Sequence, residues 1–196
     1  MGDRSLALTE TAVSCASEQA EAGPEDRIQI AVTAHFDFVW RTIRRLGVEP
    51  GAVDDAAQEV FIVANKGIAE VARTKERSYL FAIALRVAAQ KRRTQRRRRE
   101  VGNHDALREV ADGAKGPDEL LDERRARQVM DQILESLPLE QRAVFVLFEM
   151  EEMTTVQIAE MLNIPAGTVA SRLRRSRELF MKAVNRRWAR DARAGA

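Results

Sequence analysis

Cysteine and histidine are scarce in this chain of 196 residues, which has one cysteine and two histidines. Cys15 alone can form neither an internal disulfide nor a zinc cluster, which fits a reducing compartment. His35 and His104 are far apart in the sequence and have no ligand-like neighbours, so we expect no metal site. No nucleophile with a paired base and no glycine-rich phosphate loop is recognisable, so we expect no catalytic residue and no cofactor.

Long apolar runs are missing as well. No run approaches the ~18 residues that a membrane-spanning helix needs. The start of the chain does not show a basic stretch followed by an apolar block, the pattern of a secretory signal. With the single cysteine, these absences predict a cytoplasmic protein that does not insert into membranes.

Charge is present in quantity but unevenly distributed, and the net charge of +2 hides this. Residues 1–26 carry a net charge of −5, residues 86–99 carry +8 and residues 154–190 carry +6. Two basic stretches on one chain indicate two contacts with a polyanion. Residues 1–25, which are acidic and poor in periodic apolar positions, are expected to form a disordered tail.

Apolar residues recur every three or four positions over residues 26–99 and 119–185, the period of α-helices. The stretch 100–118 is rich in Gly, Asp and Asn, which is typical of a linker. No segment shows convincing strand alternation. The sequence therefore predicts an all-α protein with two small helical domains joined by a flexible linker, followed by a basic tail at 186–196.

Helix ends in the first domain can be placed from single residues. Gly47 is expected to close the first helix, because glycine tolerates the left-handed backbone that follows a helix. Asp54 and Asp55 are expected to cap the second helix, where the helix dipole favours acids. Ser78 is expected to cap the third helix.

The most specific local pattern is residues 154–180, TTVQIAEMLNIPAGTVASRLRRSRELF, which reads as helix, turn and helix. Either Thr154 or Thr155 can cap the first of these helices. Asn163 tolerates the left-handed conformation that ends a helix. Pro165 cannot continue that helix but suits the start of the next one.

The second of these helices has an inward and an outward face. Val169, Leu173 and Phe180 are spaced to point inward. Arginine can pair with guanine through two hydrogen bonds, and hydroxyl and guanidinium groups can hold phosphate. An ordinary amphipathic hairpin with a solvated basic face is the alternative, but turn, apolar spacing and arginine face coincide here as in a DNA reader. We therefore expect DNA contacts from the outward residues Thr168, Ser171, Arg172, Arg174 and Arg175.

Together these features resemble the extracytoplasmic-function group of bacterial sigma factors, the small promoter-recognition subunits of RNA polymerase. The resemblance covers residues 26–184. In the second domain it rests on Leu137-Pro138, Gln141-Arg142 and the helix-turn-helix. It implies that the helix-turn-helix recognises the upstream (minus-35) promoter element and that the first domain recognises the minus-10 element.

In the first domain, the stretch 54–61 is similar to the acidic motif with which the family binds core RNA polymerase. The resemblance assigns that role to Asp54, Asp55, Gln58, Glu59 and Phe61. If the two aspartates are helix caps, the two roles are compatible.

Residues 79–84, followed by a basic run, are similar to the family's promoter-melting helix. The basic residues expected to contact DNA phosphates there are Lys91, Arg92, Arg93 and Arg96.

The predicted function is thus a sigma factor that binds core polymerase and directs promoter-specific initiation. The family also implies an anti-sigma partner, and nothing in the sequence indicates an obligate homo-oligomer. The alternative is a stand-alone helix-turn-helix repressor or activator, which would need a self-association surface and a palindromic site.

Overall fold

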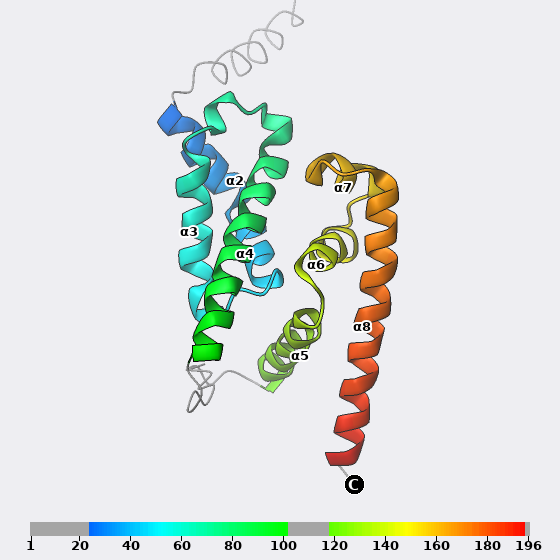
Figure 1. The fold of residues 1–196 in the computed structure, drawn as a ribbon. Helices are drawn as coiled ribbons and strands as arrows, with labels where there is room; N and C mark the ends of the chain where they lie inside the picture. Colours follow the sequence, from blue (N-terminus) through cyan, green and yellow to red (C-terminus); the bar gives the residue numbers. More distant parts are fainter. Residues whose placement is uncertain (1–23, 102–117, 195–196) are drawn as a thin grey trace, which may run out of the picture.

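The computed structural model describes residues 24–101 and 118–194, and within them all regular secondary structure is helical. Residues 1–23 of the predicted acidic tail and most of the predicted linker lie outside the described residues, whereas Pro24 and Glu25, which were expected to belong to the tail, begin α2. Figure 1 shows two groups of helices side by side, with α8 along the outer edge of the second. The first group comprises α2 (Pro24–Arg45), α3 (Val53–Ala64) and α4 (Glu76–Val101), with short 3-10 turns η1 (Pro50–Ala52), η2 (Ile68–Glu70) and η3 (Arg73–Lys75). The second comprises α5 (Asp118–Glu135), α6 (Leu139–Phe145), the π-helical turn η4 (Val146–Met150), α7 (Thr155–Leu162) and α8 (Ala166–Ala194).

The first three helices pack on one another around apolar side chains from each of them. Val39 and Ile43 of α2, Val60 of α3 and Leu80 of α4 have no exposed surface. Gly47 follows α2 with φ of 93°, which confirms the predicted helix end. These helices form the first of the two helical domains that the sequence predicts.

Two predicted caps in this domain are wrong. Helix α3 begins at Val53 with Ala52 as its N-cap, so Asp54 and Asp55 lie in its first turn, where the helix dipole still favours them. Helix α4 begins at Glu76, so Ser78 lies inside it. A tertiary contact made by Glu76, which sequence reasoning did not foresee, accompanies that start.

Glu76 is the anchor of the start of α4. Its carboxylate is 4% exposed and accepts a hydrogen bond from Arg27 Nη2 at 2.8 Å. The same guanidinium donates to the carbonyl oxygens of Ile68 and Val71. One arginine of α2 therefore ties down both the η2 turn and the beginning of α4.

The helix-turn-helix has the local structure that its sequence predicts. Thr154 is the N-cap of α7 and forms a capping box with Gln157, in which each side chain bonds the other residue's backbone amide. Asn163 ends α7 in the left-handed conformation with φ of 52°. On α8, Val169 and Leu173 are buried, and Phe180 stacks on Phe145 with ring centroids 4.8 Å apart.

The two groups of helices share one apolar core. Ile158 and Met161 of α7 belong to the same cluster of buried residues as Val87 of α4. Helix α7 packs on α4, and α5 also contacts α2 (Figure 1). The two domains therefore adopt a closed arrangement, by which we mean this direct packing of α4 on α7 and of α2 on α5.

Candidate nucleic-acid interface

The first half of α8 presents the predicted DNA-reading residues to solvent. Ser171, Arg174 and Arg175 are exposed, and Thr168 and Arg172 are partly exposed. A Cβ atom added at Gly167 would have no neighbour within 4 Å, so the beginning of this helix is open. The structure thus brings all five residues onto one accessible stretch of helix.

The arginines of this stretch are held by glutamates at the surface. Arg174 Nη1 and Arg175 Nη1 lie 3.2 Å and 3.0 Å from the two carboxylate oxygens of Glu178. Arg172 Nη2 lies 2.5 Å from the carboxylate of Glu140, which is 69% exposed. An exposed ion pair contributes only about 0–1 kcal/mol to stability, so these arginines can leave their glutamates and bind DNA at little cost in free energy.

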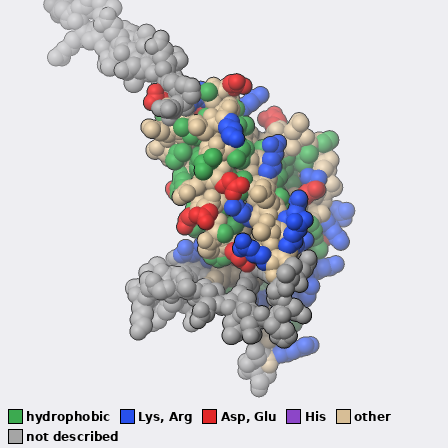
Figure 2. All heavy atoms as spheres, turned by 60° about the vertical axis from the view of Figure 1, so that its left-hand side comes forward, with side chains coloured by type: hydrophobic (Ala, Val, Ile, Leu, Met, Phe, Trp, Pro, Cys, Tyr) green, Lys and Arg blue, Asp and Glu red, His purple; other side chains and the backbone are tan. Residues whose placement is uncertain are grey.

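The second basic surface lies on α4, more than 60 residues earlier in the chain. Arg93 and Arg96 are exposed, and Lys91 Nζ lies 2.8 Å from a carboxylate oxygen of Glu59 on α3. Figure 2 shows Lys and Arg side chains gathered over the middle and right of the molecule. The structure therefore places Arg93 and Arg96 on the surface of α4, with Lys91 partly exposed beside Glu59.

Arg92 differs from its neighbours. It donates a hydrogen bond to the carbonyl oxygen of Leu46 at 2.8 Å and thereby joins α4 to the end of α2. Partial burial lowers the pKa of Arg92, and the positive charge of Arg96 lowers it further. Arg92 is thus a structural link as well as a basic group.

The predicted polymerase-binding residues lie on α3, but not all of them reach its surface. Asp54, Asp55 and Gln58 are exposed, and Glu59 is partly exposed. Asp54 accepts a hydrogen bond from Trp40 Nε1 at 2.7 Å, which fixes the first turn of α3 against α2. These residues form an acidic and amide-bearing edge.

Phe61 belongs to the core of the first domain. It is 7% exposed and stacks on Phe36, with ring centroids 6.2 Å apart. The apolar side chains that α3 does present to solvent are Ile62 and Val63, which are 67% and 40% exposed. Neither residue was among the predicted polymerase contacts, although both adjoin the acidic motif.

A buried carboxylate between the domains also escaped sequence reasoning. Glu151, which follows η4, has a side chain that is 5% exposed. Its oxygens lie 2.6 Å from Arg45 Nη1, 2.7 Å from Arg77 Nη2 and 3.9 Å from Arg41 Nε. The partners are at least 74 residues away, so no local spacing could have indicated them. One carboxylate of the second domain thus holds three arginines of the first.

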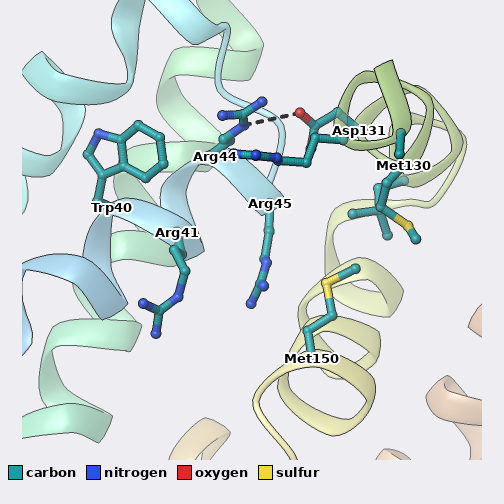
Figure 3. Close-up of a pocket in the computed structure, with 10 residues that line it drawn as sticks. Trp40, Arg41, Arg44, Arg45, Met130, Asp131 and Met150 are labelled. Atoms are coloured by element: carbon teal, nitrogen blue, oxygen red, sulfur yellow. Dashed lines mark hydrogen bonds and ion pairs between the residues drawn. The ribbon is translucent and has the colours of Figure 1, made fainter. Parts of the chain in front are cut away.

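A second ion pair and a cavity lie beside this contact. Arg44 Nε of α2 donates to Asp131 of α5 at 3.1 Å, as the dashed line in Figure 3 marks. The cavity next to it has a volume of about 490 Å³, and its apolar wall includes Trp40, Met130 and Met150. The second domain therefore meets α2 through charged side chains around an unfilled apolar space.

The described residues offer neither a metal-ligand cluster nor a membrane-spanning helix. Across residues 24–101 and 118–194, no three His, Cys, Asp or Glu side chains group as a metal site would require. No helix in the same part of the chain is long and apolar enough to cross a membrane.

Family comparisons match both domains. Residues 31–98 match the family model for sigma-70 region 2, and residues 127–180 match that for sigma-70 region 4. Together the two matches span well over half of the chain. The first contains α3 and the basic part of α4, and the second contains the helix-turn-helix.

Curated relatives extend over both regions. The ECF RNA polymerase sigma factor SigW of Bacillus subtilis is 29% identical over 174 residues, which cover 84% of this chain and 92% of SigW. The ECF RNA polymerase sigma-E factor of Escherichia coli K12 is 28% identical over 173 residues, which cover 82% of this chain and 88% of that protein.

Solved structures show the same fold. CnrH, in complex with the cytosolic domain of CnrY, superimposes with a TM-score of 0.60 at 20% identity, covering 87% of this chain and 94% of CnrH. The sigma factor RpoE of Bartonella quintana, in complex with the anti-sigma factor NepR, gives 0.60 at 16% identity, covering 80% and 96%. The chain therefore belongs to the extracytoplasmic-function group of the sigma-70 family and is a sigma factor that directs RNA polymerase to promoters, with region 4 recognising the minus-35 element and region 2 the minus-10 element.

Proposed function

We propose that the minus-35 element is read by the outward face of the first half of α8, through Thr168, Ser171, Arg172, Arg174 and Arg175. The observation that carries this proposal is the open start of α8 with arginines paired only to glutamates at the surface. A helix can enter the major groove, about 12 Å wide, where arginine distinguishes guanine. Because α7 is fixed by its capping box and by the core, α8 enters as a rigid element.

Substitution of one arginine tests this proposal. We expect Arg175→Ala to cost about 1–3 kcal/mol of discrimination at one base pair, because a bidentate contact to guanine is lost. Binding of purified protein, or of its polymerase complex, is measured on the wild-type minus-35 duplex and on single-base variants. Equal losses on every duplex would show that Arg175 contacts only phosphate, and Arg190→Ala, an exposed arginine farther along α8, is the matched control.

We further propose that Lys91, Arg93 and Arg96 contact backbone phosphates near the minus-10 element, with Arg92 contributing charge from its anchored position. The exposure of these side chains on one helix supports this role. Each phosphate contact releases counterions, so binding is expected to weaken steeply with salt.

For core polymerase we propose the edge of α3 that carries Asp54, Asp55, Gln58 and Glu59. Charge on this edge would steer the encounter, and the adjacent exposed Ile62 and Val63 supply apolar contact area. Phe61 acts in this proposal from within the core, where its packing on Phe36 positions α3.

The proposed domains are 26–99 and 119–185, linked by residues 100–118, and promoter binding requires the closed arrangement to open. The two elements are centred about 25 base pairs apart, which is roughly 85 Å at about 3.4 Å per base pair. Domains that share one core cannot reach both sites at once. The covalent connection between the domains keeps the second one at high local concentration once the first is bound.

We also propose where the protein acts and what regulates it. The chain acts in the cytoplasm, performs no catalysis itself and needs no cofactor, metal or obligate homo-oligomer. An anti-sigma factor is the proposed negative regulator. CnrH and RpoE, which share the fold, were each solved with an additional protein, the cytosolic domain of CnrY and NepR, and this supports such a partner.

A further inference from the structure

Arg142 of α6 is a buried cation at the boundary between the two domains. Its side chain has no exposed surface. Nε donates to the carbonyl oxygen of Arg45, but Nη1 and Nη2 have no hydrogen-bond partner among the described residues. Burial of a polar group without a partner costs free energy, and burial of a charged group costs more. Most of this guanidinium group is therefore removed from water without replacement of the hydrogen bonds that water gave it.

The first domain supplies the surroundings that remove this water. Gly47, just after α2, lies so close that a Cβ atom added to it would be 2.6 Å from Arg142 Nη1. Arg92 of α4 approaches the same glycine, and its Nη1 would be 3.2 Å from the added atom. Because Arg142 belongs to the second domain, these contacts exist only in the closed arrangement. Closing therefore takes water from Arg142 and brings a second positive charge towards it.

The acids around Arg142 offset its charge without favouring closure. Burial, with a smaller contribution from the positive charge of Arg92, lowers the pKa of Arg142 to about 9, although Glu135 and Asp131 act to raise it. Both acids lie on α5, in the same domain as Arg142, so they accompany it whether or not the domains meet. In the closed arrangement Asp131 is in addition engaged by Arg44 of α2, at 3.1 Å. The surroundings that closure creates thus disfavour the charged group.

We propose that Arg142 opposes closure and thereby keeps the closed arrangement able to open. Glu151 acts in the opposite direction, because its carboxylate gains three arginines of the first domain when the domains meet. The free protein is balanced between a carboxylate that gains partners on closing and a guanidinium group that loses water without gaining enough partners. Removal of the charge at position 142 therefore shifts the balance towards the closed arrangement.

A consequence for transcription follows if promoter binding requires opening, as proposed above. Arg142 then reduces the free energy that polymerase and promoter must supply to separate the domains. This consequence rests on the proposed function, whereas the effect of Arg142 on closure of the free protein does not. A measurement without DNA or polymerase therefore tests the inference by itself.

Energy transfer between one dye on each domain tests the proposal in the full chain. Arg142→Met is introduced into the Glu151→Gln variant, in which closure is weakened and an increase in closure is visible. Replacement of buried ionic groups by apolar side chains is often stabilising, by enough to change an equilibrium about tenfold. We therefore expect Arg142→Met to raise the ratio of closed to open molecules about tenfold in this background. An unchanged or lowered ratio would overturn the proposal, because a residue that only joins the domains loosens them when it is removed.

Matched variants separate the charge of Arg142 from its packing. Arg142→Gln removes the charge but keeps an amide donor, so it is expected to raise the ratio as well, and it carries the test if Arg142→Met does not fold. Arg193→Met makes the same change at an exposed arginine of α8 and is expected to leave the ratio unchanged. Equal increases in Arg142→Met and Arg193→Met would mean that the effect is not specific to Arg142. Thermal unfolding is measured beside energy transfer, and a loss of stability in both Arg142 variants without a gain in closure would make Arg142 a structural residue and the proposal wrong.

Discussion

The contact of Glu151 with three arginines makes the closed arrangement quantitatively testable through Glu151→Gln. Removing one partner of a buried ion pair costs about 3–5 kcal/mol when the remaining charge stays dry. Here the side chains of Arg45, Arg77 and Arg41 are 27%, 42% and 46% exposed, so water takes over part of the lost interaction. We therefore expect a loss of about 2 kcal/mol, which lowers the ratio of closed to open molecules roughly 30-fold.

The ratio can be read from energy transfer between two dyes, one on each domain. Ala69 in region 2 and Asn185 on α8, beyond the matched part of region 4, are both exposed, so both can be replaced by cysteine for labelling. Cys15, the one native cysteine, is replaced by serine. Glu151→Gln is expected to lower transfer efficiency in the free protein and to increase the population with separated dyes.

The adjacent residue provides the control. Glu152 is exposed and has the same charge, so Glu152→Gln should leave the transfer efficiency unchanged. If both variants behave alike, or if Glu151→Gln lowers the thermal stability of region 4 without separating the dyes, Glu151 does not hold the domains together and the reasoning fails.

Two further predictions concern α7 and α4. Thr154→Ala removes the N-cap of α7 and is expected to destabilise region 4 by about 1 kcal/mol in denaturant unfolding. Thr155→Ala should have a smaller effect, because the side chain of Thr155 is not the N-cap. Equal losses of stability in the two variants would contradict the capping-box assignment. Promoter binding by the polymerase complex is measured at several salt concentrations for wild type and Arg96→Ala. Because one phosphate contact is lost, the slope of log affinity against log salt concentration should fall in magnitude by about 1. An unchanged slope would show that Arg96 is not part of the DNA interface.

Features with a local cause were predictable from the sequence. The cap at Thr154, the left-handed Asn163 and the glycine after α2 each depend on what one residue can do with its neighbours, and the structure confirms them. The all-α class and the helix-turn-helix follow from periodicity and turn residues in the same way. The five outward residues of α8 reach the surface because their inward neighbours are apolar.

Features that depend on distant residues were not predictable. The start of α4 is anchored by Glu76 through Arg27, 49 residues earlier, so the cap expected at Ser78 was misplaced. Phe61 is buried in the core of the first domain and stacks on Phe36 of α2, a contact that an acidic motif on α3 does not reveal. Glu151 and Arg142 gain their environments only when the two domains meet, and no spacing within one segment indicates such a meeting.

The central claim, that this chain brings core polymerase to promoters through α3 and α8, is tested most directly with purified core enzyme. Co-purification and run-off transcription are measured for wild type, for Asp55→Ala/Gln58→Ala on α3, and for Glu70→Ala/Gln29→Ala, which removes an exposed acid and an exposed amide elsewhere in the first domain. We expect wild type and the control pair to bind core and give promoter-specific transcripts, and the α3 pair to lose at least tenfold in both. Failure of the wild-type protein to bind core, combined with binding of duplex DNA on its own, would contradict the account.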